Sequence, residues 1–250
     1  ERRGNLSGIL NGIDTERFDP GADPTIAMKY SVRHADMRVK NKAALQERFG
    51  LAHDEHAMVI AYNGRLDEQK GISLLVATLK PLLDNLPFQF VAMGDGNPEY
   101  KKFFKELSEA YPGRVGVCLE YDENLPRMIY AGADAMLIPS RFEPAGLVQL
   151  EAMRYGAIPI ARKTGGLADT VTDFDPAEQS GTGFAFTDFD SQALMIAMTR
   201  AYETFRNKPA WRALQKRAMA ADFSWGSSAK EYAHLFEVAL ALHRRASVRS

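Results

Sequence analysis

Short apolar segments alternate with amphipathic ones through the middle of the chain. Five segments are hydrophobic at nearly every position, as is typical of strands buried on both faces of a sheet: 58–62, 88–93, 115–119, 135–138 and 158–161. The stretches between and after them carry apolar residues at helical spacing, which predicts helices at 71–83, 98–110, 125–131, 146–155 and 166–171. Strands that alternate with helices through short loops form right-handed crossovers and a parallel sheet. The predicted fold class is therefore α/β, with a doubly wound, Rossmann-like parallel sheet.

The two flanks of this region have a different character. Residues 1–57 are rich in turn formers at first and contain one predicted helix at 40–49, so we interpret them as a lead-in to the sheet. Residues 58–190 contain all the predicted strands. From 191 to 250 the pattern is helical throughout, with helices expected at 191–205, 209–220 and 227–242.

Composition and charge narrow the classes of function. The chain has 250 residues, with 31 Lys and Arg against 32 Asp and Glu, so its net charge of −1 favours neither nucleic acid nor an anionic membrane as partner. Its apolar runs are far shorter than the roughly 20 residues of a membrane-spanning helix. The one cysteine, Cys118, excludes an internal disulfide and a multi-cysteine metal site, and it suits a reducing compartment. Because no Met begins the chain, we expect it to be part of a longer protein.

Polar loops follow the predicted strands, where ligands bind in open α/β sheets. Arg65 and Lys70 follow the first strand, and Arg and Lys side chains are suited to phosphate oxygens. Residues Thr164, Gly165 and Gly166 follow the fifth strand and open a helix, whose free N–H groups favour an anion. Solvated loop cations and a plain capped turn are the alternative interpretations of these two loops.

Two glutamates also lie near the fourth predicted strand. Glu143 and Glu151 are eight residues apart, which is about 12 Å along a helix. Glycosidase carboxylates lie about 5–5.5 Å or about 6.5–9.5 Å apart, so the pair suits contacts to different hydroxyls of one elongated ligand better. Chance spacing on a helix is the alternative. A glycine pair at Gly94 and Gly96 has Glu99 where a dinucleotide-binding motif needs a small residue, which disfavours NAD.

Taken together and in order, these loops resemble a known family. The motifs that carry the resemblance are GILNGID at 8–14, GRLDEQKG at 64–71, PSRFEPAGL at 139–147, MRYG at 153–156 and TGGLADTV at 164–171. They resemble the C-terminal half of bacterial glycogen synthases and plant starch synthases, which are retaining glucosyltransferases of the two-domain GT-B architecture. The resemblance covers the chain from Gly8 to the last helices. It implies that residues 58–190 form a nucleotide-sugar-binding domain and that 191–250 pack on it and toward a missing N-terminal domain.

The resemblance also implies roles for individual residues. Arg65 and Lys70 match the pair that holds the nucleotide diphosphate, and Glu143 matches the residue that contacts the donor sugar. These three are the candidate catalytic residues. The other candidate binding residues are Tyr121 for adenine, Glu151 for ribose as in related glycosyltransferases, and Gly146, Leu147, Thr164, Gly165 and Gly166 for phosphate or sugar through the backbone. Ala145 and Val148 depart from the Cys and Thr common in the family.

The implied reaction transfers glucose from ADP-glucose to the non-reducing end of an α-1,4-glucan with retention. No cofactor is implied, and no metal is required if Arg65 and Lys70 supply the positive charge that the leaving diphosphate needs. The implied location is a plastid stroma or a bacterial cytoplasm. UDP-glucose or another donor, a different acceptor, and a non-catalytic module that binds nucleotide sugar or glucan stay open as alternatives.

Overall fold

The computed structural model describes residues 6–120 and 122–247 and contains one six-stranded sheet. The strand order is β3-β2-β1-β4-β5-β6, and every neighbouring pair is parallel. The strands are β1 (Met58–Asn63), β2 (Phe88–Met93), β3 (Val115–Cys118), β4 (Ala135–Ile138), β5 (Ile158–Arg162) and β6 (Phe184–Phe186). The order reverses between β1 and β4, which is the switch point of a doubly wound sheet. The predicted fold class is confirmed.

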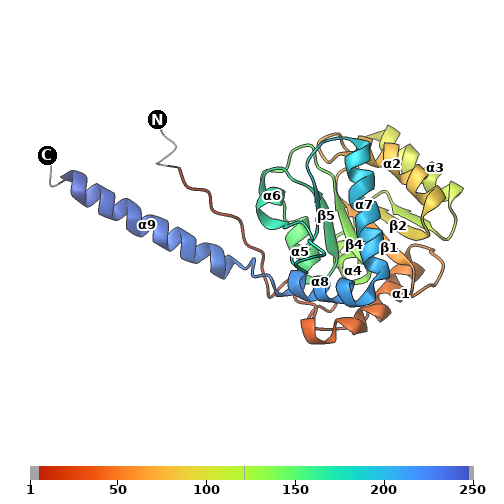
Figure 1. The fold of residues 1–250 in the computed structure, drawn as a ribbon, viewed down its shortest axis with the longest axis horizontal. Helices are drawn as coiled ribbons and strands as arrows, with labels where there is room; N and C mark the ends of the chain where they lie inside the picture. Colours follow the sequence, from red (N-terminus) through yellow and green to blue (C-terminus); the bar gives the residue numbers. More distant parts are fainter. Residues whose placement is uncertain (1–5, 121, 248–250) are drawn as a thin grey trace.

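Helices cover both faces of the sheet (Figure 1). They are α1 (Arg38–Arg48), α2 (Ile72–Asn85), α3 (Pro98–Ala110), α4 (Leu125–Gly132), α5 (Val148–Arg154), α6 (Gly166–Thr170), α7 (Ser191–Arg206), α8 (Lys208–Ala220) and α9 (Trp225–Ser247). Alternate side chains of β1 enter two separate cores. Ile60 belongs to the core that includes α2, α3 and α7, whereas Val59 and Ala61 belong to the core that includes α1 and α4. Burial on both faces explains why the strands are apolar at almost every position.

The structure corrects several details of the predicted elements, and α9 extends beyond the expected 227–242 at both ends. A sixth strand, β6, follows a loop of turn formers, and with three residues it is too short to show a pattern. Helix α5 begins at Val148 and not at 146, because Gly146 has a φ of +70°, which lies outside the helical region. A short 3-10 helix, Val32–Met37, leads into α1, which begins two residues before the predicted start.

A buried hydrogen-bond chain attaches the lead-in to the sheet-bearing body. The Tyr155 hydroxyl donates to Asp23 Oδ2 at 2.5 Å, and the Tyr30 hydroxyl donates to the Tyr155 carbonyl at 2.7 Å. Burial would raise the pKa of Asp23, but hydrogen bonds from Tyr155 and Thr25 outweigh it and lower the pKa. Asp23 is therefore held in its charged form inside the protein.

Tyr155→Phe is expected to lower the free energy of unfolding by about 1–3 kcal/mol, because it leaves the buried Asp23 carboxylate short of a donor. The Asp23 contribution is present above the carboxyl's ordinary pKa and is lost as the pH falls through its lowered value, so the difference between the two proteins shrinks in acid. Urea unfolding of wild type and Tyr155→Phe at pH 7 and at pH 3 measures this difference in the free energy of unfolding. Tyr232→Phe is the matched control, since the Tyr232 ring is 40% exposed; an equal effect of both changes would contradict the assignment.

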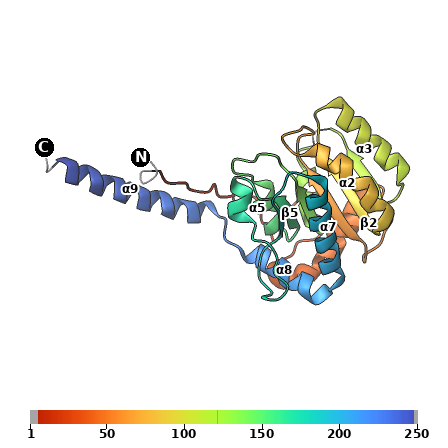
Figure 2. The same ribbon diagram turned by 45° about the horizontal axis from the view of Figure 1, so that its top comes forward.

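Helix α9 projects away from the rest of the structure (Figures 1 and 2). The N-terminal segment runs beside its first turns, where the Ser228 hydroxyl donates to the Leu10 carbonyl at 2.8 Å. The Ile13 amide likewise donates to the Phe223 carbonyl at 2.8 Å. Large apolar side chains of α9 are exposed, among them Phe236 at 63%. Among the described helices, none is both long and apolar enough to cross a membrane.

Candidate functional site

The loops after β1 and β4 bring two of the predicted site residues into direct contact. Lys70 Nζ lies 2.5 Å from Glu143 Oε2, although the two residues are 73 positions apart. The Ser140 hydroxyl donates to the same carboxylate oxygen at 3.1 Å. The side chains of Lys70 and Glu143 are 23% and 10% exposed, so the pair is largely shielded from solvent. A cation and a carboxylate thus stand together at the carboxyl edge of the sheet.

Close backbone packing fixes the position of this pair. The Arg141 amide donates to the Gln69 carbonyl at 2.8 Å and joins the two loops. Gly71 has a φ of +74°, and a Cβ built there would lie 2.0 Å from the Pro139 carbonyl oxygen. Only glycine therefore lets the loop after β1 approach the loop after β4 so closely.

The loop after β5 packs against the same place. A Cβ on Gly165 would lie 1.9 Å from the Glu143 carbonyl oxygen, and one on Gly166 would lie 2.1 Å from that of Ala145. Both glycines therefore support the loop that carries Glu143. Thr164 is half-buried, and its carbonyl accepts a hydrogen bond from the Leu167 amide at 3.1 Å. The structure brings this predicted phosphate loop next to Glu143 through backbone contacts.

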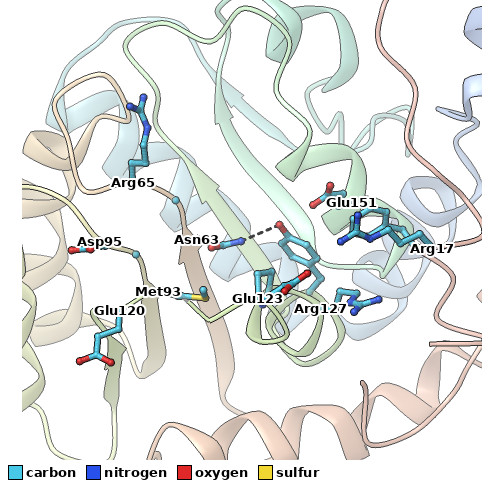
Figure 3. Close-up of a pocket in the computed structure, with 14 residues that line it drawn as sticks. Arg17, Asn63, Arg65, Met93, Asp95, Glu120, Glu123, Arg127 and Glu151 are labelled. Atoms are coloured by element: carbon cyan, nitrogen blue, oxygen red, sulfur yellow. Dashed lines mark hydrogen bonds between the residues drawn. The ribbon is translucent and has the colours of Figure 1, made fainter. Parts of the chain in front are cut away.

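A pocket of about 420 Å³ opens beside the pair, and we call it the rim pocket (Figure 3). It is lined by Arg17, Phe18, Asn63, Gly64, Arg65, Met93, Gly94, Asp95, Glu120, Glu123, Pro126, Arg127, Tyr130 and Glu151. Lys70 and Glu143 line a smaller adjoining cavity of about 40 Å³ together with Gly146 and Leu147. Asn63 lines both and connects them.

Arg65 and Glu151 stand at different ends of the rim pocket (Figure 3). The Arg65 side chain is 65% exposed and lies 3.3 Å from Asp67, so it has room to turn toward an incoming anion. Glu151 lies close to Arg17 in the view of Figure 3. Burial raises the pKa of Glu151, while a hydrogen bond from Tyr130 and the charge of Arg17 oppose that rise.

The rim pocket also contains polar residues that the sequence did not single out. Asn63 Nδ2 donates to the Tyr130 hydroxyl oxygen at 3.0 Å, and burial raises the pKa of that phenol. Arg17 reaches the pocket from the lead-in, where the Asp14 carboxylate accepts hydrogen bonds from the Glu16 and Arg17 amides, both at 3.0 Å. The sequence pattern did not indicate the direction of the Arg17 side chain. Tyr130 sits in a predicted amphipathic helix, where a tyrosine is indistinguishable from an ordinary core residue.

The predicted site residues thus fall into three groups. Arg65 and Glu151 line the rim pocket. Lys70, Glu143, Gly146 and Leu147 line the adjoining cavity. Gly165 and Gly166 support the Glu143 loop without lining either space, Thr164 precedes them and lines neither space, and Tyr121 lies outside the described residues. Within the described ranges, no group of three or more His, Cys, Asp or Glu side chains is placed to hold a metal ion.

Residues 44–212 match the sequence profile of the family described as glycosyl transferases group 1. The chain belongs to the group 1 glycosyltransferase family. It is 47% identical to glycogen synthase 1 of Synechocystis sp. over 94% of this chain and 49% of that protein. It is 42% identical to a glycogen synthase of Geobacillus stearothermophilus over 94% of this chain and 48% of that protein. This glycosyltransferase chain therefore spans about half the length of the curated relatives it matches.

Solved structures agree with this assignment. The chain superimposes with a TM-score of 0.86 on the catalytic domain of starch synthase IV from Arabidopsis thaliana, described as bound to ADP and acarbose. The two are 38% identical, and the match covers 94% of this chain and 49% of that one. A sucrose-phosphate synthase from Thermosynechococcus elongatus has a TM-score of 0.62 at 27% identity, over 94% of this chain and 52% of that one. The chain shares both sequence and fold with the half of these enzymes that it matches, and the resemblance to glycogen and starch synthases is confirmed.

Proposed function

We propose that this domain binds ADP-glucose at the rim pocket and the adjoining Lys70–Glu143 cavity. In the full-length protein it would transfer the glucose with retention to the non-reducing end of an α-1,4-glucan. The observation that carries the proposal is the contact between Lys70 and Glu143 in a cavity that adjoins a pocket large enough for a nucleoside. The relatives named glycogen synthase, and the starch synthase described as bound to ADP, support this choice of donor and acceptor.

The chemistry of the transfer matches the charges at the site. Breaking the bond between the anomeric carbon and the phosphate oxygen places negative charge on the leaving diphosphate. Cations that are already in position stabilise this charge as it develops, and in this proposal Lys70 and Arg65 do so without a metal ion or cofactor. The diphosphate would replace Glu143 as the ion-pair partner of Lys70. The freed carboxylate of Glu143 would then contact hydroxyls of the glucosyl ring, on which positive charge builds.

The nucleoside would occupy the rim pocket. Glu151 would accept hydrogen bonds from the ribose hydroxyls, and Tyr121 would stack on the adenine. Backbone N–H groups at Gly146, Leu147, Thr164, Gly165 and Gly166 would approach phosphate or sugar. The position of Glu151 in the rim pocket supports the ribose contact.

The domain would need the rest of the protein for efficient transfer. Active sites of two-domain glycosyltransferases lie in the cleft between the domains, and this chain spans about half of its relatives. The exposed apolar side chains on α9, such as Phe236 and Leu242, give the second domain a surface on which to pack. We therefore propose that the isolated chain binds the donor but transfers glucose poorly or not at all.

Calorimetric titration of the isolated chain with ADP-glucose, UDP-glucose and NAD tests the proposal. We expect saturable 1:1 binding of ADP-glucose, weaker binding of UDP-glucose and none of NAD. Tighter binding of UDP-glucose would contradict the proposed donor. Robust glucan synthesis by the isolated chain would contradict the need for a second domain.

ADP-glucose binding is expected to weaken as the pH is lowered below 7. A carboxylate recognises a ribose diol by accepting hydrogen bonds, and the raised pKa of Glu151 moves the loss of that acceptor to higher pH than for an exposed glutamate. Glu151→Gln should bind ADP-glucose more weakly at pH 7 and show little further loss on acidification. Glu109→Gln, which changes an exposed glutamate on α3, is the control. A parallel pH dependence in wild type and Glu151→Gln would exclude Glu151 as the titrating group.

A further inference from the structure

A second cavity lies at the opposite edge of the sheet, where the strands begin. Its volume is about 390 Å³, similar to that of the rim pocket. It is lined by Ala35, Asp36, Arg38, Val39, Lys42, Glu55, His56, Gly132, Asp134, Phe205, Lys208, Trp211, Arg212 and Gln215. These residues belong to α1, to the end of α7, to α8 and to the segments that precede β1 and β4. Figure 1 shows α1 and α8 together at this end of the sheet. We call it the opposite-edge cavity.

Cations outnumber their carboxylate partners in this cavity. Lys42 is paired with Asp134 at 2.7 Å, with both side chains 8% exposed. Arg38, Lys208 and Arg212 form no ion pair with any other described residue. Three cationic groups therefore line this surface without an ion-pair partner, beside the carboxylates of Asp36 and Glu55.

Lys208 is partly buried and lies near other positive charges. Its ammonium lies 3.3 Å from the centroid of the Phe205 ring, and Lys42 approaches the same ring at 5.2 Å. Burial lowers the pKa of Lys208, and the like charges of Lys42 and Arg212 lower it further, against the opposing effect of Asp134 and Asp54. An anion bound between Lys208 and Arg212 would relieve this repulsion.

Two buried donors in the wall of the cavity have no partner among the described residues. Arg38 is 6% exposed, and its Nε–H group makes no hydrogen bond, although its Nη2 group donates to the Tyr130 and Ala133 carbonyls. Trp211 is 3% exposed, and its indole N–H group is also without an acceptor. An indole or guanidinium N–H can only donate, and a buried donor left unsatisfied destabilises the protein. Each of these two N–H groups therefore lacks an acceptor oxygen.

We propose that the opposite-edge cavity is a binding site for a small phosphorylated anion, separate from the donor site. Phosphate oxygens accept hydrogen bonds from several donors at once and pair with Arg and Lys, which matches unpaired cations beside unsatisfied N–H groups. Lys208 is also the first residue of α8, so the positive end of that helix faces the same region. The site is distinct from the Lys70–Glu143 pair because the two lie at opposite ends of the strands.

The two tryptophans make the proposal testable by NMR. Trp211 lies in the cavity wall, whereas Trp225 is 50% exposed at the start of α9, so one indole N–H signal reports on the site and the other is an internal control. The probe is inorganic phosphate, titrated at constant ionic strength and pH 7 into the ¹⁵N-labelled chain. We expect a saturable shift of the Trp211 indole signal and no comparable shift of Trp225. Trp211→Phe assigns the signals.

Matched variants test whether the phosphate binds in the opposite-edge cavity. Lys208→Ala combined with Arg212→Ala should weaken phosphate binding at least 10-fold, while the exposed pair Lys102→Ala and Lys105→Ala should leave it unchanged. Lys70→Ala should also leave the Trp211 shift unchanged, which separates this site from the proposed donor site. The proposal is overturned if the Trp211 signal shows no saturable shift, if the Lys208/Arg212 variant titrates like wild type while remaining folded, or if Lys70→Ala abolishes the shift.

Discussion

Lys70→Ala is expected to weaken binding of ADP to this domain by about 10- to 100-fold, because hydrogen bonds to charged groups contribute about 1.5–3 kcal/mol. Lys70 is better shielded from solvent than Arg65, and its ammonium is already held in place by Glu143 at 2.5 Å. Calorimetric titration of wild type and variant with ADP at the same salt concentration measures the effect. Lys70→Arg should recover part of the affinity, since it keeps the charge.

Two controls make this result specific. Lys80→Ala removes an exposed lysine from α2, away from both cavities, and should bind ADP like wild type. Urea unfolding of Lys70→Ala checks that the loss of the Glu143 partner has not unfolded the domain. A folded Lys70→Ala protein with wild-type ADP affinity would exclude Lys70 from the binding site.

Gly71→Ala is expected to lower the free energy of unfolding by about 3–5 kcal/mol, because it adds a steric clash to backbone strain. The φ of +74° disfavours any residue with a Cβ, and that Cβ would lie 2.0 Å from the Pro139 carbonyl oxygen. The backbone must therefore move, and the loops that carry Lys70 and Glu143 are pushed apart. Affinity for ADP should fall together with stability.

Gly50→Ala is the matched control for this prediction. Gly50 has a similar φ of +64°, but nothing lies within 4 Å of its added Cβ. Gly50→Ala should lower the free energy of unfolding by about 1–2 kcal/mol, through the strain of the left-handed backbone alone. It should leave ADP binding unchanged. Urea unfolding of both variants measures the difference. Equal destabilisation by the two changes would show that the contact with Pro139 does not constrain the loop.

Most of the sheet could be predicted because its strands are buried on both faces. Burial demands apolar side chains at nearly every position, as in Phe88–Met93, and such runs stand out between amphipathic helices. Strand β6 escaped prediction because three residues at the edge of the sheet are too few to show a pattern. The start of α5 was misplaced because helical spacing alone does not show that Gly146 has a positive φ.

The part of the candidate site that depends on which strands are neighbours could be predicted. Lys70 and Glu143 follow strands that lie side by side in the sheet, so their loops had to meet at one edge. Arg17 could not be found in this way, because it reaches the rim pocket from the lead-in through tertiary packing. The opposite-edge cavity likewise combines residues from α1, α7 and α8. Helix packing brings them together, and the sequence pattern does not show how the helices pack.

Hydrogen exchange with and without ADP-glucose tests the central claim most directly, because it locates the bound donor on the chain. We expect slower exchange on adding ADP-glucose in peptides that cover 63–71, 139–147 and 163–167, and no such slowing in Lys70→Ala at the same concentration. Protection confined to other segments, or unchanged exchange in all three loops at saturating ADP-glucose, would contradict a donor site at this edge of the sheet.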